Sequence, residues 1–387
     1  MAVYLVVVLS ALTSISLRGS KVAVSLYALE LGAGAATVGV LAALFAAFPL
    51  LLAVPAGQLA DRFGVRAPIV AGTLIMAAGL ALPLALPGLT TLLLCPALVG
   101  LGHVFFHVSV HSLVGALSPE AERTRNFATF SLGISIAAFI GPSAAGFAIE
   151  LGSYRAAFAL LAAIALLPAL YAMVHRGLIP ARVRQQEPEG KSAFDLLAIP
   201  ELRRTLIMSG VALTGIELFS FYLPIYGSAI GLAPSVIGMI LSSHAVAGFI
   251  VRMFMHRLAQ RYTELGVLTG SLFLAALAYL AIPALGNAWL LAGAAFVLGL
   301  ALGSAQPLTI ILTYNQAPAG RSGEALGMRI MANKVTQIAV PLVFGGFGAA
   351  LGAVPVFVAT GVFLLGAGAL SLKSAGSKLQ RVQETRS

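Results

Sequence analysis

Long apolar segments separated by short charged stretches constrain this 387-residue chain more than any other feature. One charged stretch, residues 57–66 with the sequence GQLADRFGVR, has on each side an apolar segment long enough to cross a bilayer. Charged groups are costly inside a membrane, so we expect this stretch to form a tight turn at the membrane surface. The pattern predicts a protein that crosses the membrane repeatedly.

The composition supports the same prediction. Hydrophobic residues make up 59% of the chain and charged residues 9%, with a mean hydropathy of +0.99, whereas soluble domains are about 25% charged. Each span needs about 20 apolar residues and must satisfy its own backbone, so we expect an all-α membrane protein. Its twelve transmembrane helices are predicted at residues 3–27, 36–56, 67–87, 91–115, 126–148, 154–174, 204–227, 234–255, 265–284, 287–312, 323–349 and 354–372.

The net charge of +10 could suggest a nucleic-acid partner, but its distribution indicates a membrane topology instead. If Met1 lies inside, the basic loop residues fall almost entirely on the inner side, and Arg155 is the exception. This is the positive-inside distribution, so we expect a multi-pass protein of the cytoplasmic (inner) membrane with both termini cytoplasmic. Cys95 is the only cysteine, so no internal disulfide can form.

The hydrophilic segment 175–203 is expected to be a solvated cytoplasmic linker between two six-helix bundles. The domains are then 1–174, 175–203, 204–372 and a polar, mobile cytoplasmic tail at 373–387. An ungapped shift of 199 residues superimposes the two halves. It matches Gly32 with Gly231, Gly39 with Gly238, Gly100 with Gly299, Pro142 with Pro341 and Gly146 with Gly345. In repeat transporters the substrate site lies near mid-membrane, where the halves meet.

Ionisable residues at membrane depth are functional candidates by default. Glu217 is the one acid expected there, and the shift of 199 places it opposite Arg18 (217 − 18 = 199). The two could form a salt bridge across the pseudo-twofold axis, either as part of the site or as a purely structural ion pair. Alternatively, Glu217 could carry a proton, because burial disfavours a charged carboxylate.

Cations outnumber acids in the predicted spans. Arg329, Asn333 and Gln337 recur every four residues and form a polar stripe about 12 Å long. With Arg18, Lys21, Arg252 and Lys334, the expected cations exceed the single acid Glu217, and a bound anion could supply the missing negative charge. Arg252 could instead extend its charge to the cytoplasmic surface.

Histidines form a second group of candidates. His103, His107 and His111 are spaced four apart in one helix, and His244 lies near mid-depth in another. A pair with this spacing can hold a metal ion, but no acid or cysteine completes a ligand set. We favour hydrogen-bonding roles in a cavity, with His107 also a candidate for proton coupling. The repeat places His107 opposite Gln306.

The stretch at 57–66 resembles the signature loop of the major facilitator superfamily, and the resemblance extends over the whole chain. It implies a gating role for Gly57, Asp61, Arg62, Gly64 and Arg66. Val65 departs from the family pattern, which usually has a basic residue there. A second copy at 256–261 has lost its acid, since Gln260 stands in its place.

The fifth predicted helix also resembles a family motif. Gly133, Gly141, Pro142 and Gly146 match a relaxed form of the antiporter motif, which implies export, although small residues around a proline kink also serve helix packing. The family's proton-linked arginine would fall near Pro96 and is missing. Arg252 resembles an arginine that oxalate and monocarboxylate transporters use to hold a carboxylate.

Together these observations predict a secondary transporter that works by alternating access and carries a small organic anion. Its expected partners are this substrate, protons and the lipid bilayer. We expect no nucleic-acid partner, no cofactor and no enzymatic activity. We expect a monomer. Drug or metabolite efflux is the alternative, and a metal-binding or sensor protein is a third. The expected substrate-binding residues are Arg18, Lys21, His103, His107, Glu217, His244, Arg252, Gln306, Arg329, Asn333 and Gln337.

Overall fold

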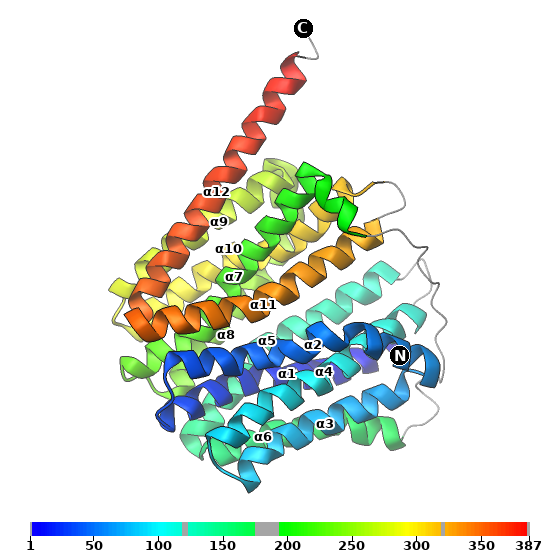
Figure 1. Ribbon diagram of the computed structural model, residues 1–387, viewed down its shortest axis with the longest axis vertical. Helices are drawn as coiled ribbons and strands as arrows, with labels where there is room; N and C mark the ends of the chain where they lie inside the picture. The colour runs from blue at the N-terminus through cyan, green and yellow to red at the C-terminus, as the bar shows by residue number, and fades with distance from the viewer. Residues whose placement is uncertain (1, 118–122, 175–192, 319–321, 385–387) are drawn as a thin grey trace. The chain divides into compact units, whose positions relative to one another are not determined.

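The computed structural model describes residues 2–117, 123–174, 193–318 and 322–384 (Figure 1). Within these ranges, twelve helices are long and apolar enough to cross a membrane, which confirms the predicted all-α class. The helices are α1 (Ala2–Glu30), α2 (Ala35–Phe63), α3 (Arg66–Ala85), α4 (Leu89–Leu117), α5 (Arg123–Leu151), α6 (Tyr154–Val174), α7 (Pro200–Ala229), α8 (Pro234–Tyr262), α9 (Glu264–Ala281), α10 (Ala288–Gln316), α11 (Ser322–Leu351) and α12 (Ala353–Glu384), with short 3-10 helices η2 (Ala193–Ala198) and η3 (Ile282–Ala284).

The turn between α2 and α3 is much shorter than the sequence pattern predicted. Helix α2 continues through the charged stretch to Phe63, and only Gly64 and Val65 separate it from α3. Gly64 has φ of +80°, a conformation that glycine adopts without steric strain. The reversal of the chain therefore takes two residues, and most of the charged stretch is the last part of a helix.

Two polar segments that were expected to be irregular contain helix. Helix α12 continues through the predicted tail to Glu384, where alanine, lysine, glutamine and leucine favour helix. The last part of the predicted linker forms η2, in which Leu196 is only 1% exposed. Leu196 packs in a cluster with Leu202, Leu206, Ala325 and Met328. Residues 175–192 of the predicted linker lie outside the described residues, and its last four residues begin α7.

The described residues form two compact units. The first contains α1 to α6 together with Leu223–Ser242 and Pro341–Ala349, and the second contains the rest of α7 to α12. The end of α7, the beginning of α8 and the end of α11 therefore pack with the N-terminal six helices. The predicted division into two six-helix bundles rests on the sequence repeat and remains a prediction, whereas the compact units reflect the packing.

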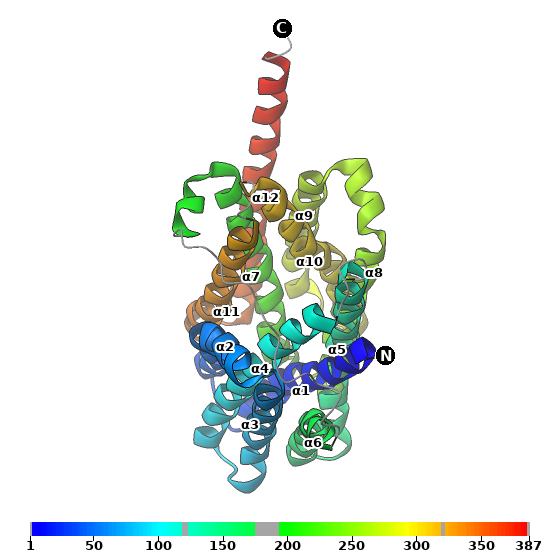
Figure 2. The same cartoon turned by 90° about the vertical axis from the view of Figure 1, so that its right-hand side faces the viewer.

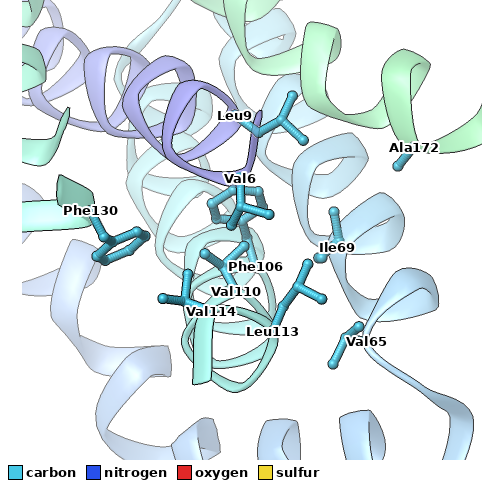
Figure 3. Close-up of a cluster of buried hydrophobic side chains, with 10 residues drawn as sticks. All are labelled: Val6, Leu9, Val65, Ile69, Phe106, Val110, Leu113, Val114, Phe130 and Ala172. Atoms are coloured by element: carbon cyan, nitrogen blue, oxygen red, sulfur yellow. The ribbon is translucent and has the colours of Figure 1, made fainter. Parts of the chain in front are cut away.

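An apolar cluster lies within the first unit, among the helix ends near the α2–α3 turn (Figure 3). Val65, the residue that departs from the family pattern, is 1% exposed in this cluster. A basic side chain here would place a charge among apolar neighbours at high cost. The cluster consists of Val6, Leu9, Val65, Ile69, Phe106, Val110, Leu113, Val114, Phe130 and Ala172.

The sequence repeat has a counterpart in the helix contacts within each unit. Helix α3 packs on α4 and α6, and α9 packs on α10 and α12 in the same way (Figures 1 and 2). Gly100 of α4 approaches the backbone oxygen of Phe45 in α2, and Gly299 of α10 approaches that of His244 in α8. Both pairs are related by the shift of 199 (299 − 100 and 244 − 45). Equivalent residues thus make equivalent contacts in the two halves.

Candidate functional site

Polar side chains from α7, α10 and α11 meet inside the second unit. Helix α10 carries a row of polar residues at intervals of three, four and three, namely Gln306, Thr309, Thr313 and Gln316. This spacing places them on one face of the helix. The face contacts α7, where the Thr205 hydroxyl donates to Gln316 Oε1 at 2.7 Å. Further along, it contacts the predicted stripe of α11.

Five of these residues form what we call the arginine cluster: Ser209, Gln306, Thr309, Arg329 and Asn333. Arg329 Nε and Nη2 donate to Thr309 Oγ1 at 3.2 and 3.1 Å, and Nη2 also donates to Gln306 O at 3.1 Å and to Gln306 Oε1. Asn333 Nδ2 donates to the same Oε1 at 3.4 Å. Its Oδ1 accepts from the Ser209 hydroxyl at 3.1 Å. The cluster therefore joins three helices through side chains.

Among the described residues, Arg329 donates hydrogen bonds to neutral groups. Its side chain is 5% exposed, and its hydrogen bonds within the described part of the chain all end on neutral oxygens. A buried cation without a counter-charge is electrostatically unfavourable and attracts an anion. The amide nitrogen of Gln306 is also buried and has no hydrogen-bond partner among the described residues. Two donors that an anion could use thus lie in one cluster.

A second group, the glutamate cluster, lies further along α11 and contains Glu217, Lys334 and Gln337. Gln337 Nε2 donates to Glu217 Oε1 at 3.2 Å, and Lys334 Nζ donates to Gln337 Oε1 at 3.0 Å. One glutamine therefore links the acid of α7 to a lysine of α11. Lys334 was not predicted as a site residue, because its position in the helix places it off the stripe.

The other predicted residues of the second unit lie on α8. Arg252 Nε donates to the backbone oxygen of Gly303 at 3.0 Å, one turn of α10 before Gln306. Its side chain is exposed. The ring of His244 stacks against Phe219, with 5.1 Å between the ring centroids. Neither contact joins these residues to the arginine cluster.

The predicted residues of the first unit lie on α1 and α4. Arg18 is exposed on α1 and Lys21 is half-buried one turn later. Along α4 the rings of His103 and His107 lie 5.2 Å apart, and those of His107 and His111 lie 4.1 Å apart. Among the described residues, no group of three or more histidine, cysteine, aspartate or glutamate residues could hold a metal ion. The expected pairing of Arg18 with Glu217 remains a prediction.

The charged stretch 57–66 has one charged side chain whose contacts are defined, that of Arg66. Arg66 Nε donates to Ala172 O at 2.9 Å, and Nη2 donates to Met173 O at 3.2 Å. Both carbonyls belong to the last turn of α6, where helices leave acceptors unsatisfied and where positive charge is favourable. Arg66 therefore ties α3 to α6 within the first unit. The side chains of Asp61 and Arg62 lie outside the described set, so their gating role stays a prediction.

The glycines of α5 allow close helix contacts. Gly133 approaches Val7, and Gly141 approaches the backbone of α1 at Ile15. Gly146 approaches the first turn of α8, where a Cβ atom would lie 2.5 Å from Pro234 O. These contacts are compatible with both interpretations of the motif, as an antiporter motif and as a site of close helix packing.

Sequence reasoning found part of the arginine and glutamate clusters. It named Glu217, Gln306, Arg329, Asn333 and Gln337, which the structure brings into contact in two groups. It missed the hydroxyl residues of the arginine cluster, because serine and threonine are common in helices of any function. A usable signal existed, since the spacing of α10 puts Thr309 beside Gln306, but the role of Ser209 depends on the contact between α7 and α11. The missed residues are Ser209 and Thr309, whereas Lys334 was counted among the cations but not among the binding residues.

Comparisons with known proteins identify the family and the fold. The sequence profile described as Major Facilitator Superfamily matches residues 6–234 and 205–384. The chain is 21% identical over 348 residues to the quinolone resistance protein NorA of Staphylococcus aureus (strain COL), with 88% of each chain covered. Its fold is similar to that of the nucleoside transporter NupG, with a TM-score of 0.80, 14% identity and 96% and 99% of the two chains covered. A bacterial homologue of the human lysosomal transporter Spinster, in an inward-facing and unoccupied conformation, gives a TM-score of 0.82 at 15% identity, with 98% and 97% covered.

Proposed function

This chain belongs to the Major Facilitator Superfamily, and on that premise we propose that it carries a small organic anion. It is a multi-pass membrane protein and a secondary transporter of this superfamily. The proposal extends this to the substrate, to coupling with protons, to a monomer in the cytoplasmic membrane, and to cytoplasmic termini. Alternating access then moves the two repeats around a site near mid-membrane.

The observation that carries the anion proposal is the environment of Arg329. Its guanidinium is almost completely buried, yet its described hydrogen bonds go only to neutral oxygens of Thr309 and Gln306. A carboxylate or phosphate would supply the missing negative charge, and the planar guanidinium suits such groups. Gln306 and Asn333 would orient the substrate, while Arg18, Lys21, His103, His107, His244 and Arg252 are proposed to line its path.

Glu217 is the proposed proton carrier. Its carboxylate accepts from Gln337, which in turn accepts from Lys334. A proton on Glu217 would neutralise the carboxylate at one end of this chain of hydrogen bonds. The protonation would then change the electrostatic environment of Lys334 at the other end. His107 is the second candidate for this role.

The direct test is thermal unfolding of the purified protein in detergent with a panel of carboxylates, organic phosphates, lipophilic cations and divalent metals. A ligand that binds only the folded state stabilises it by about 2.7 kcal/mol at a hundred times its Kd. We expect one class of anions to raise the melting temperature, and Arg329→Gln to abolish this rise. Arg204→Gln removes one exposed positive charge from α7 and should leave the rise unchanged.

The response of Arg329→Lys separates charge from geometry, because lysine keeps the charge and loses the two-pronged donor. We expect a weakened anion response in this variant. An anion response that survives unchanged in Arg329→Gln would contradict the proposal.

Efflux of drugs or metabolites is a second candidate, supported by the 21% identity to a quinolone resistance protein. It predicts that loss of this chain sensitises its host to several unrelated compounds. Stabilisation by lipophilic cations, with none by anions, would favour it over the anion proposal.

A further inference from the structure

Two close contacts between helices lie within the first unit and are related by the sequence repeat. We call the contact between α5 and α8 the α5–α8 seam, and that between α2 and α11 the α2–α11 seam. In the α5–α8 seam, Gly238 approaches Pro142 O, and a Cβ atom on Gly238 would lie 2.6 Å from that oxygen. In the α2–α11 seam, Gly39 approaches Pro341 O in the same manner. The pairs are equivalent, because 238 − 39 and 341 − 142 both equal 199. The repeat therefore builds the same backbone contact twice.

A second pair of glycines extends both seams toward the same end. Gly146 approaches Pro234 and Ser235 at the start of α8, and its equivalent Gly345 approaches Ala35 and Ala36 at the start of α2. Each seam thus joins the last third of one helix to the first turns of another. The positive-inside distribution assigns this end of the bundle to the outer side of the membrane.

The two seams differ in their polar contacts. At the α5–α8 seam, Glu150 Oε2 accepts from the backbone N–H of Ser235 at 3.1 Å. Ser235 is in the first turn of α8, where backbone N–H groups have no partner within the helix and where the helix dipole favours a carboxylate. The equivalent positions in the α2–α11 seam are Ala349 and Ala36, which offer no such contact.

Hydroxyl groups add a second difference. Ser242 Oγ of α8 donates to Phe139 O of α5 at 2.7 Å, and lies 2.7 Å from Ser143 Oγ. Since the Ser242 proton is directed to Phe139, Ser143 is the donor in the second bond. The equivalents of Ser143 and Ser242 are Leu342 and Ala43. The α5–α8 seam therefore has polar contacts at positions where the equivalent residues of the α2–α11 seam are apolar.

We propose that Glu150 is a positioning residue that holds the outer end of the transporter closed at the α5–α8 seam. Alternating access moves one repeat against the other, so both seams separate when this end opens. The α2–α11 seam separates without breaking a side-chain hydrogen bond of this kind, whereas the α5–α8 seam must release the charged contact of Glu150. The asymmetry makes α5 and α8 the pair that sets how readily this end opens. The proposal rests on the transporter class and not on the anionic substrate.

The test measures the separation of α5 and α8 without any substrate. Spin labels on Leu151→Cys and Ile230→Cys, in a Cys95→Ala background, report on the two sides of this seam, since both residues are exposed. Their separation is measured by electron paramagnetic resonance in proteoliposomes. We expect Glu150→Ala to raise the ratio of open to closed populations by about tenfold, which corresponds to about 1.4 kcal/mol. Glu150→Gln keeps a neutral acceptor and should fall between Glu150→Ala and the unmodified protein.

The repeat supplies a rescue that a merely structural role would not give. Ala349 is exposed and equivalent to Glu150, so Ala349→Glu should place a carboxylate at the first turn of α2. In the Glu150→Ala background, we expect this change to restore the closed population. Glu30→Ala, at the same end of the bundle and outside both seams, is the matched control. The proposal is overturned if Glu150→Ala matches that control, or if the double variant stays as open as Glu150→Ala.

Discussion

At the scale of single residues, Arg329 depends on neighbours that are individually weak. Thr309 accepts from both Nε and Nη2, and Gln306 accepts twice from Nη2. A buried donor that loses its acceptor carries a desolvation penalty of about 1–3 kcal/mol, and more when it is charged. The threonine is therefore expected to matter more than its small size suggests.

Thr309→Val tests this dependence, because valine keeps the shape and removes the hydroxyl. We expect a loss of stability of at least about 1–3 kcal/mol, since Arg329 loses an acceptor in a buried site. The measurement is thermal unfolding in detergent. Thr360→Val is the control, because Thr360 is equally buried and its hydroxyl donates only to the preceding turn at Val356 O. Equal losses in the two variants would argue against a special role for Thr309.

Val65 stands where the family pattern usually has a basic residue, and its neighbours are apolar. Val65→Lys would restore the basic residue that the family pattern favours, but in a site that is 1% exposed among apolar side chains. An uncompensated buried charge costs about 3–5 kcal/mol. We expect a large drop in the yield of folded protein on size-exclusion chromatography. Ala67→Lys, at an exposed position two residues later, should be tolerated. A normal yield of Val65→Lys would show that the lysine reaches solvent.

At the scale of elements, η2 fastens the end of the linker to the second unit. Leu196 is 1% exposed and packs against Leu202 and Leu206 of α7 and against Ala325 and Met328 of α11. Ala325 lies one turn before Arg329, so η2 supports the part of α11 that carries the arginine cluster. The buried leucine of this short helix therefore packs against both α7 and α11.

Leu196→Ala should loosen this attachment. Removing a buried leucine side chain costs about 2–5 kcal/mol, depending on how far the site collapses. We expect faster hydrogen exchange in η2 and in the adjoining ends of α7 and α11, measured by mass spectrometry. Leu197→Ala changes the neighbouring leucine, which is 36% exposed, and should leave exchange nearly unchanged. If both variants exchange alike, the packing of Leu196 contributes little.

At the scale of the whole molecule, the repeat determines which backbone segments approach closely. Gly100 and Gly299 occupy equivalent positions and face backbone oxygens of Phe45 and His244. Backbone atoms cannot rotate away as side chains do, so a methyl group at either position must push two helices apart. The same constraint therefore acts once in each half of the chain.

Gly100→Ala and Gly299→Ala should accordingly have similar effects. We expect each to destabilise the protein by about 1–3 kcal/mol, measured by thermal unfolding. Gly346→Ala is the control, since a Cβ atom there meets nothing within 4 Å. A large effect in one half with none in the other would mean that the equivalence of the two contacts does not extend to their energetics.

The sequence alone determined the helical spans, their number and the register of the repeat. Hydropathy and backbone hydrogen bonding act along the chain, so the apolar segments of α1 to α12 can be recognised without knowing their neighbours. The stripe of Arg329, Asn333 and Gln337 was predictable for the same reason, because helical periodicity places these residues on one face. The residues at which helices end were less predictable, as the extension of α2 to Phe63 shows.

Only the tertiary structure decided which polar groups meet. That Arg66 binds the last carbonyls of α6, that Gln337 donates to Glu217, and that Glu150 accepts from Ser235 all depend on the rotation and approach of separate helices. No local pattern encodes these contacts, since they join residues far apart in the sequence. Burial likewise explains Val65, whose environment comes from several helices at once. Periodicity fixes the face on which a side chain lies, and packing fixes its partner.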